Sequence, residues 1–284
     1  MRFISYQVNG QNSFGLLRDA NDVIDLRERL GARADTLMAL IATGEAMALA
    51  APHATAKADH QLGDVQLLAP IADPHTIACV GHNYEEHRKE TQRDPTAFPS
   101  IFMRGSESLQ AAGADLLMPR ESTQLDYEGE LAIVIGKGGR RIAEADAWDH
   151  VFGVTCFNDG SVRDWQHHTR QFIPGKNFPQ TGGFGPALVT LDELPSSRVV
   201  ALSTRVNGVT VQHATTDQMI FPIPVLVNYI STFVTLRPGD VIVTGTPGGV
   251  GVKRNPPLWL KPGDKVEVEI SSVGLLVNGV SAEP

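Results

Sequence analysis

Short runs rich in valine and isoleucine dominate the chain after about residue 70, and they constrain its fold more than any other feature. Glycine and proline interrupt these runs, and helical patterns do not alternate with them. Because a doubly wound parallel sheet needs a helix after each strand, the pattern argues against that architecture and predicts a β-rich α+β fold. The runs are TIACVG (76–81), LAIVIG (131–136), VFGVTCF (151–157), PALVTL (186–191), VIVTG (241–245) and KVEVEI (265–270).

The first 65 residues are predicted to form a small α/β domain of their own. Within residues 1–28, the stretches FISYQV, FGLL and VIDL indicate short strands, and residues 37–50 indicate a helix. The polar stretch 51–63 shows no periodicity and is the best linker candidate. We therefore expect a boundary near residue 65–70, with a larger domain over 70–284.

Composition and charge narrow the possible partners. The 284 residues carry 24 Lys and Arg against 32 Asp and Glu, a formal net charge of −8, which argues against binding to nucleic acid or an anionic membrane. The two cysteines, Cys79 and Cys156, form no C-x-x-C pair, and this favours a reducing compartment. No signal peptide is indicated, and residues 218–236 contain two prolines and are interpreted as buried structure. We expect a cytoplasmic protein with a small-molecule partner and no membrane association.

Three carboxylates indicate a metal site. Glu128 and Glu130 precede a strand, and alternation along a strand places both on one face. Asp159 follows a second apolar run, where functional side chains are often presented. Clustered carboxylates favour a hard divalent cation such as Mg²⁺ or Mn²⁺. The alternatives are a solvated sheet face for the two glutamates and a simple turn for Asp159.

Other segments offer acid–base and anion-binding groups. His87 and Glu90 stand three residues apart, so one helical turn brings them together and the carboxylate can raise the basicity of the ring. The alternative is that His87 and Glu90 belong to an ordinary charged helix surface. Lys176 could stabilise an enolate, although an isolated lysine is usually solvated. The segment TGTPGGVG (244–251) can present backbone N–H groups and the Thr246 hydroxyl to an anion.

Several of these segments, in their order along the chain, resemble the fumarylacetoacetate hydrolase family. They are GHNYEEHRKE, FMR, LDYEGELAIVIGK, FNDGSVRDWQ, GKNF, FGPALVT and TGTPGGVG. The resemblance covers about residues 70–280, and residues 1–65 are similar to the short N-terminal domain of many bacterial members. It implies a mixed β-roll, a homodimer, and one Mg²⁺ or Mn²⁺ per subunit.

The resemblance also implies roles for single residues. The metal ligands would be Glu128, Glu130 and Asp159. The catalytic residues would be the water-activating pair His87 and Glu90 together with Lys176, which corresponds to the family's lysine after the NDxSxRDxQ segment. The substrate contacts would be Arg163, Gln166 and Thr246. The chain departs from the family pattern at His82, Gly160, Gly105-Ser106 and His167-His168. Because these positions are expected near the pocket, the departures bear on the substrate more than on the metal.

The leading hypothesis from the sequence is hydrolysis of a carbon–carbon bond in a β-diketo acid, such as an acylpyruvate, to a keto acid and a carboxylate. Arg163 would bind the substrate carboxylate through both arms of its guanidinium. The alternatives at the same metal site are decarboxylation of oxaloacetate or another 2-oxo diacid and keto–enol isomerisation. Replacing His87 by Ala is expected to stop hydrolysis alone. A phosphohydrolase lacks support because no phosphate loop is present, and a non-catalytic binding protein would not need His87, Glu90 and Lys176 together.

Overall fold

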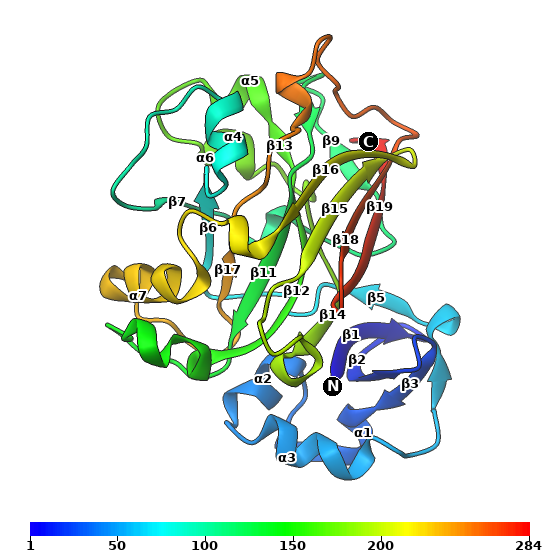
Figure 1. Cartoon of the computed structure of the whole chain (residues 1–284). Coiled ribbons are helices and arrows are strands. Elements are labelled where there is room, and N and C mark those ends of the chain that lie inside the picture. The colour runs from blue at the N-terminus through cyan, green and yellow to red at the C-terminus, as the bar shows by residue number, and fades with distance from the viewer.

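Twelve strands join in one large mixed sheet that runs through the protein (Figure 1). We describe a computed structural model that covers residues 1–284. The strands are β1 (Arg2–Val8), β2 (Gln11–Arg18), β3 (Asp22–Asp25), β4 (His60–Gln61), β5 (Gln66–Leu68), β6 (Ile77–Gly81), β7 (Ser100–Met103), β8 (Leu109–Ala111), β11 (Gly129–Ile135), β12 (Val151–Asp159), β14 (Gly182–Thr190) and β17 (Val241–Val243). Their order is β4-β3-β2-β1-β14-β12-β11-β17-β6-β7, with β5 beside β1 and β8 beside β14. The pairs β17–β6 and β14–β8 are parallel and the others antiparallel.

A second sheet packs on one face of the first. Its five strands, in spatial order, are β16 (Val209–Thr215), β15 (Ala201–Val206), β18 (Lys265–Ile270), β19 (Gly274–Ala282) and β9 (Leu116–Met118). A two-stranded ribbon joins β10 (Leu125–Asp126) and β13 (Ser161–Val162). Leu131 and Ile133 of β11 share a buried cluster with Leu202 and Val268 of the second sheet. Ala132 belongs to the cluster on the opposite face, so β11 is apolar on both sides.

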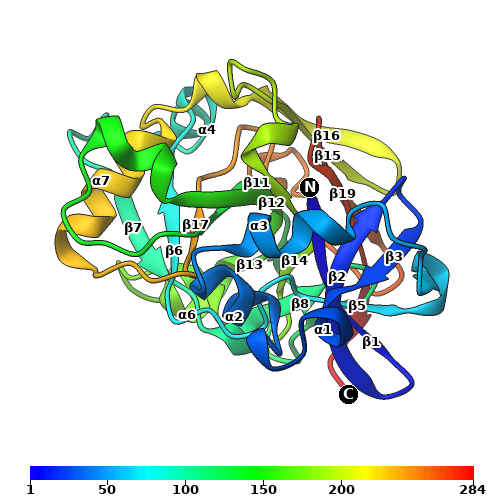
Figure 2. The same cartoon turned by 90° about the horizontal axis from the view of Figure 1, so that it is seen from below.

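Helices are short and lie mostly at the two ends of the large sheet. They are α1 (Leu26–Leu30), α2 (Leu37–Ala42), α3 (Ala46–Ala50), α4 (Glu85–Glu90), α5 (Arg163–Gln166), α6 (Ile173–Lys176) and α7 (Ile223–Phe233), with 3₁₀ turns at Gly31–Arg33, Ala51–His53, Leu62–Asp64, Ser106–Ser108, Glu144–His150, Leu191–Glu193, Thr216–Gln218 and Gly251–Lys253. Figures 1 and 2 place α1, α2 and α3 with the N-terminal strands, while Figure 1 shows α4, α5 and α6 gathered at the far end of β11. None of these helices has the length and apolar character that crossing a bilayer requires.

The β-rich α+β fold predicted from the runs of valine and isoleucine is confirmed, and every run quoted above contains a strand. The N-terminal segment differs from the expectation in two details. The helix predicted over 37–50 is interrupted at Gly44, which adopts a positive φ of 72° and ends the first piece. The stretch 51–63 is not a plain linker, because it includes β4, which pairs with β3. Since β1 also pairs with β14, the proposed boundary near residue 65–70 lies within a continuous sheet and stays a prediction.

Candidate metal centre

The register of β11 and β12 brings three carboxylates together at one end of the large sheet. Glu130 lies on β11 and Glu128 directly before it, so strand alternation turns both to the same face. Asp159 ends β12, and its backbone N–H donates to the carbonyl of Glu128 at 2.8 Å. Oxygen atoms of the three side chains lie within 4.8 Å of one another, and all three residues are buried. The strands therefore bring together a carboxylate triad: Glu128 and Glu130, as alternation along the strand predicted, and Asp159, as the family resemblance implied.

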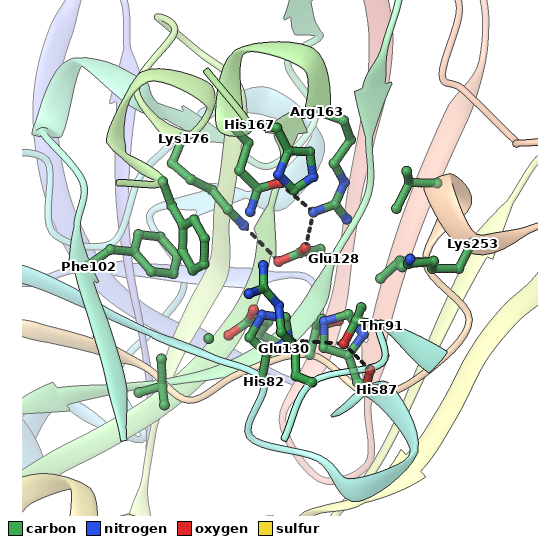
Figure 3. Close-up of a pocket in the computed structure, with 18 residues that line it drawn as sticks. His82, His87, Thr91, Phe102, Glu128, Glu130, Arg163, His167, Lys176 and Lys253 are labelled. Atoms are coloured by element: carbon green, nitrogen blue, oxygen red, sulfur yellow. Dashed lines mark hydrogen bonds and ion pairs between the residues drawn. The ribbon is translucent and has the colours of Figure 1, made fainter. Parts of the chain in front are cut away.

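Three cations hold two members of the triad, Glu128 and Asp159, in place. Lys176 Nζ donates to Glu128 Oε2 at 2.7 Å and to Asp159 Oδ2 at 2.6 Å, so it bridges two members. Arg163 Nη1 lies 2.7 Å from Glu128 Oε1, and Arg104 Nη1 lies 2.5 Å from Asp159 Oδ1. Figure 3 shows the Glu128 carboxylate between Lys176 and Arg163. Since all these groups are buried, the ligand oxygens have fixed positions before anything binds.

The two glutamates respond oppositely to this environment. Burial raises the pKa of Glu128, but the nearby charges of Lys176 and Arg163 outweigh it and hold the pKa well below the usual value. Burial raises the pKa of Glu130, and the charges of Asp159 and Glu128 raise it further. The backbone N–H of Gly245 donates to the Glu130 carboxylate. Glu130 is thus the one member of the triad that forms no ion pair with a positively charged side chain.

The donor set fits a hard divalent cation. The site offers three carboxylates and no sulfur or imidazole ligand within the triad, which is the oxygen-rich set that Mg²⁺ and Mn²⁺ prefer. The buried groups comprise four carboxylates, Asp126, Glu128, Glu130 and Asp159, and three cations, Arg104, Arg163 and Lys176, so their formal charge is 3 − 4 = −1. A divalent ion brings this sum to +1, and the loaded site then attracts an anionic ligand.

Two glycines allow the chain to approach closely around the triad. A Cβ on Gly160 would lie 2.0 Å from the carbonyl oxygen of Thr181, so no larger residue fits after Asp159 without movement. A Cβ on Gly175 would lie 2.4 Å from the backbone nitrogen of Gln166, where α6 packs on α5. The departure from the family pattern at Gly160 therefore has a local steric reason, and Gly175 lets Lys176 reach the carboxylates.

His87 and Glu90 form the pair that their spacing on α4 predicted. His87 Nδ1 lies 2.8 Å from Glu90 Oε1. Burial raises the pKa of Glu90, but hydrogen bonds from His87 and from the N–H of Gly249 outweigh it and keep the pKa below the usual value. Because Glu90 is then an ionised acceptor, the ring proton belongs on Nδ1, and Nε2 is left as a base.

His82 is an additional pocket residue that packs on this pair. Its ring stacks on the ring of His87 with centroids 5.2 Å apart, and Nδ1 lies 3.3 Å from Thr91 Oγ1. Its φ of 56° is left-handed, an uncommon conformation for a residue with a side chain. Burial and the neighbouring His87 lower the pKa of His82 to about 4. The ring is therefore neutral near pH 7.

The three predicted substrate contacts line the pocket but are already engaged. Arg163 Nε donates to Asp126 and Nη1 to Gln166 Oε1, so its guanidinium cannot bind a ligand through both arms, and only the buried Nη2 lacks a partner. This corrects the bidentate role expected from the sequence. Thr246 Oγ1 donates to the carbonyl of Gly129 and accepts from Gln212.

One pocket joins the two glutamates of the triad to His82 and His87. Its cavity measures about 130 Å³, and its lining includes Glu128, Glu130, Lys176, His82 and His87. Figure 3 shows Phe102 on one side of it, next to Lys176, and His82 and His87 below Glu128. A cavity of this size suits a small acid rather than a long chain.

Sequence inspection missed several supporting residues. Arg104 donates to Asp159, and Asp126 accepts from Arg163. Gln212 accepts a hydrogen bond from the N–H of Gly129, which lies between the two glutamates. Asp126 stands two residues before Glu128, so strand periodicity could have indicated it. Arg104 and Gln212 come from distant segments and carry no local signal.

Comparison with known proteins agrees with this geometry. The model of the fumarylacetoacetate (FAA) hydrolase C-terminal family matches residues 76–281. The mitochondrial oxaloacetate tautomerase fahd2 of Xenopus laevis is 40% identical over 99% of this chain and 90% of its own length. A putative HpcE protein from Mycobacterium smegmatis has a similar crystal structure, with a TM-score of 0.89, 34% identity and full coverage of both chains. The structure of maleylpyruvate hydrolase from Sphingobium sp. SYK-6 in complex with manganese(II) and pyruvate gives a TM-score of 0.83 at 26% identity, again with full coverage of both chains.

Proposed function

Because the chain belongs to the fumarylacetoacetate hydrolase family, we propose that it is a divalent-metal-dependent enzyme that interconverts the keto and enol forms of a short 2-oxo acid, with oxaloacetate as the substrate. The observation that carries this proposal is the presence of a fixed base, His87, in the same small pocket as Glu128 and Glu130 of the carboxylate triad. Tautomerisation needs only these parts: a site that favours negative charge on the substrate oxygen, and a base within reach of the carbon that loses its proton.

The cation would be Mg²⁺ or Mn²⁺ held by Glu128, Glu130 and Asp159. When bound, it acts as a Lewis acid that withdraws electron density from a substrate carbonyl. Lys176 keeps two of the ligands in place, because its ammonium group donates to Glu128, Asp159 and the Asp159 carbonyl and has no proton left over. This makes Lys176 a positioning residue rather than a direct partner of the substrate.

His87 would move the proton. Nε2 takes a proton from C3 of the keto acid, the C–H electron pair becomes the C2=C3 double bond, and the C2 carbonyl oxygen receives the proton back to give the enol. Glu90 holds the ring orientation through Nδ1 and stabilises the imidazolium that forms in between. Free Nη2 of Arg163 is placed to donate to a substrate carboxylate, because this nitrogen is buried in the pocket wall without a partner.

Hydrolysis of an acylpyruvate is the second candidate, since His87 and Glu90 can equally take a proton from water and a structural neighbour is a maleylpyruvate hydrolase. Both reactions need the same base, so the His87→Ala test expected from the sequence does not separate them. Decarboxylation of oxaloacetate starts from the same activated 2-oxo acid. The homodimer and the cytoplasmic location stay predictions.

A direct comparison of products tests the proposal. The Mn²⁺-loaded protein is mixed with enol oxaloacetate, and the loss of enol absorbance is followed beside CO₂ release; in parallel, acylpyruvate and maleylpyruvate are assayed for pyruvate. We expect enol loss to be accelerated without matching CO₂ and to require the metal. Faster release of pyruvate from an acylpyruvate, with no acceleration of enol loss, would replace tautomerisation by hydrolysis. Protein treated with a chelator is the control.

A further inference from the structure

Three basic side chains lie at the mouth of the pocket, and the proposed chemistry uses none of them. Arg93, His167 and Lys253, here called the rim, line the same cavity as Glu128 and Glu130 of the carboxylate triad. They come from three separate segments: the chain after α4, the residue after α5, and the 3₁₀ turn Gly251–Lys253. All three are exposed, in contrast to the buried cations Arg104, Arg163 and Lys176 beside the triad.

No carboxylate of the chain neutralises the rim. Neither Arg93 nor Lys253 takes part in any ion pair, although neighbouring Arg88 pairs with Glu85. This is unusual in a chain with a formal net charge of −8, where acidic partners are in excess. Partial burial lowers the pKa of His167, and the charges of Arg163, Arg93 and Lys253 lower it further, so its ring is neutral near pH 7 and contributes hydrogen bonds rather than charge.

A second, buried group points to the same ligand chemistry. Arg163 is 5% exposed, and its Nη2 has no hydrogen-bond partner. Figure 3 shows His167 beside Arg163. Positive groups thus line the pocket from the buried Lys176, through Arg163, to Arg93 and Lys253 at the rim. An anionic ligand with charge at one end only would leave the outer part of this series without a partner.

We propose that Arg93 and Lys253, together with His167, bind the second carboxylate of the substrate and so select dicarboxylic 2-oxo acids over monocarboxylic ones. The inference rests on the proposed function for the orientation of the ligand, with its 2-oxo acid end at the triad. The small cavity limits the separation between the two carboxylates to that of a short diacid. The rim residues act on specificity and take no part in proton transfer.

Two unreactive ligands isolate this effect. L-malate and L-2-hydroxybutyrate share a 2-hydroxy acid end and differ by a carboxylate in place of a methyl group. Their binding to the Mn²⁺-loaded protein is measured by calorimetry for the parent chain, Arg93→Gln, Lys253→Gln and the double variant. Lys57→Gln, an exposed lysine of the N-terminal segment, is the matched control.

We expect malate affinity to fall about fivefold in each single variant and more than about tenfold in the double variant, with 2-hydroxybutyrate unchanged and Lys57→Gln silent. Raising the salt concentration should reduce the malate preference, because exposed charges are screened. Equal losses for both ligands, no loss in the double variant, or no malate preference in the parent chain would each overturn the inference. Malate selection without any tautomerisation of oxaloacetate would instead refute the proposed function alone.

Discussion

The floor of the pocket and its α4 wall are constructed in different ways. The floor consists of Glu128, Glu130 and Asp159 on two central strands, and their side chains are at most 7% exposed. The wall carries His87 and Glu90 on a single helical segment of six residues. Long-range ion pairs fix the floor, whereas the central contact of the wall joins residues three apart. The comparison teaches that ligand geometry is set by the sheet, and base geometry by a local segment packed on it.

Glu128→Ala should have the largest effect on turnover and stability because it removes one of the three carboxylates of the floor. Its removal deletes a proposed metal ligand and leaves Lys176 and Arg163 short of a buried partner. We expect metal-dependent turnover to be abolished and the unfolding free energy of the metal-free protein to fall by about 3–5 kcal/mol. Turnover at saturating Mn²⁺ and denaturant unfolding are the measurements.

Glu130→Gln separates the metal role from folding. Neighbouring carboxylates and burial raise the pKa of Glu130, so a neutral amide replaces it in the metal-free protein at little cost. We expect unchanged unfolding without metal and no stabilisation by added Mn²⁺. Normal Mn²⁺ stabilisation in this variant would contradict the ligand assignment.

His87→Ala removes the proposed base from the α4 wall and leaves the three carboxylates of the floor unchanged. Loss of a general base typically lowers kcat by about 10²–10⁴-fold, while the affinity for Mn²⁺ should stay within about twofold of the parent value. Rate measurements and calorimetric titration with Mn²⁺ check this. A parallel loss of metal affinity would mean that floor and wall are not independent.

Gly160→Ala tests how closely the floor is packed. The new Cβ would meet the Thr181 carbonyl oxygen, and such overpacking costs about 1–3 kcal/mol of unfolding free energy. The matched control is Gly63→Ala, since a Cβ at Gly63 has open space around it. Denaturant unfolding should show a loss for the first variant and little change for the second; equal behaviour would argue against a rigid floor.

The smallest expected effect concerns an exposed ion pair on α4. Hydrogen bonds from Arg88 lower the pKa of Glu85 to about 2, below its unfolded value of about 4.3. A lowered pKa contributes stability above the unfolded value, and that contribution disappears as the pH falls towards 2. Amide exchange in α4, corrected for intrinsic rates, should therefore speed up modestly between pH 5 and pH 2, and Glu85→Gln should remove this dependence. Exchange in β11 serves as the internal control.

Patterns with a fixed local period were predictable from the sequence. The strand runs, the common face of Glu128 and Glu130, and the contact of His87 with Glu90 all follow from alternation along a strand or one helical turn. Gly44 carried the signal that ends α2, although the wider helical pattern concealed it.

Contacts between distant segments were not predictable in this way. Arg104 is 55 residues from Asp159, and Lys176 is 48 residues from Glu128, so no local pattern records either pair. For the same reason, the sequence indicated a free guanidinium at Arg163, while the fold engages it with Asp126 and Glu128. Such contacts depend on tertiary packing, and the local periodicity of a single sequence does not reveal it.

The pairing of β1 with β14 has a consequence for the order of events during synthesis. Arg2 pairs with Val189, so β1 leaves the ribosome 189 − 2 = 187 residues before its partner. At about 5–20 residues per second, Arg2 and Phe3 wait roughly 10–40 s for that partner, whereas β5 covers Ser5–Gln7 of the same edge earlier. An open edge is a template for pairing with another chain. We therefore expect translation speed and chaperone supply to affect the yield of correctly folded protein through the start of β1, far from the residues proposed for chemistry.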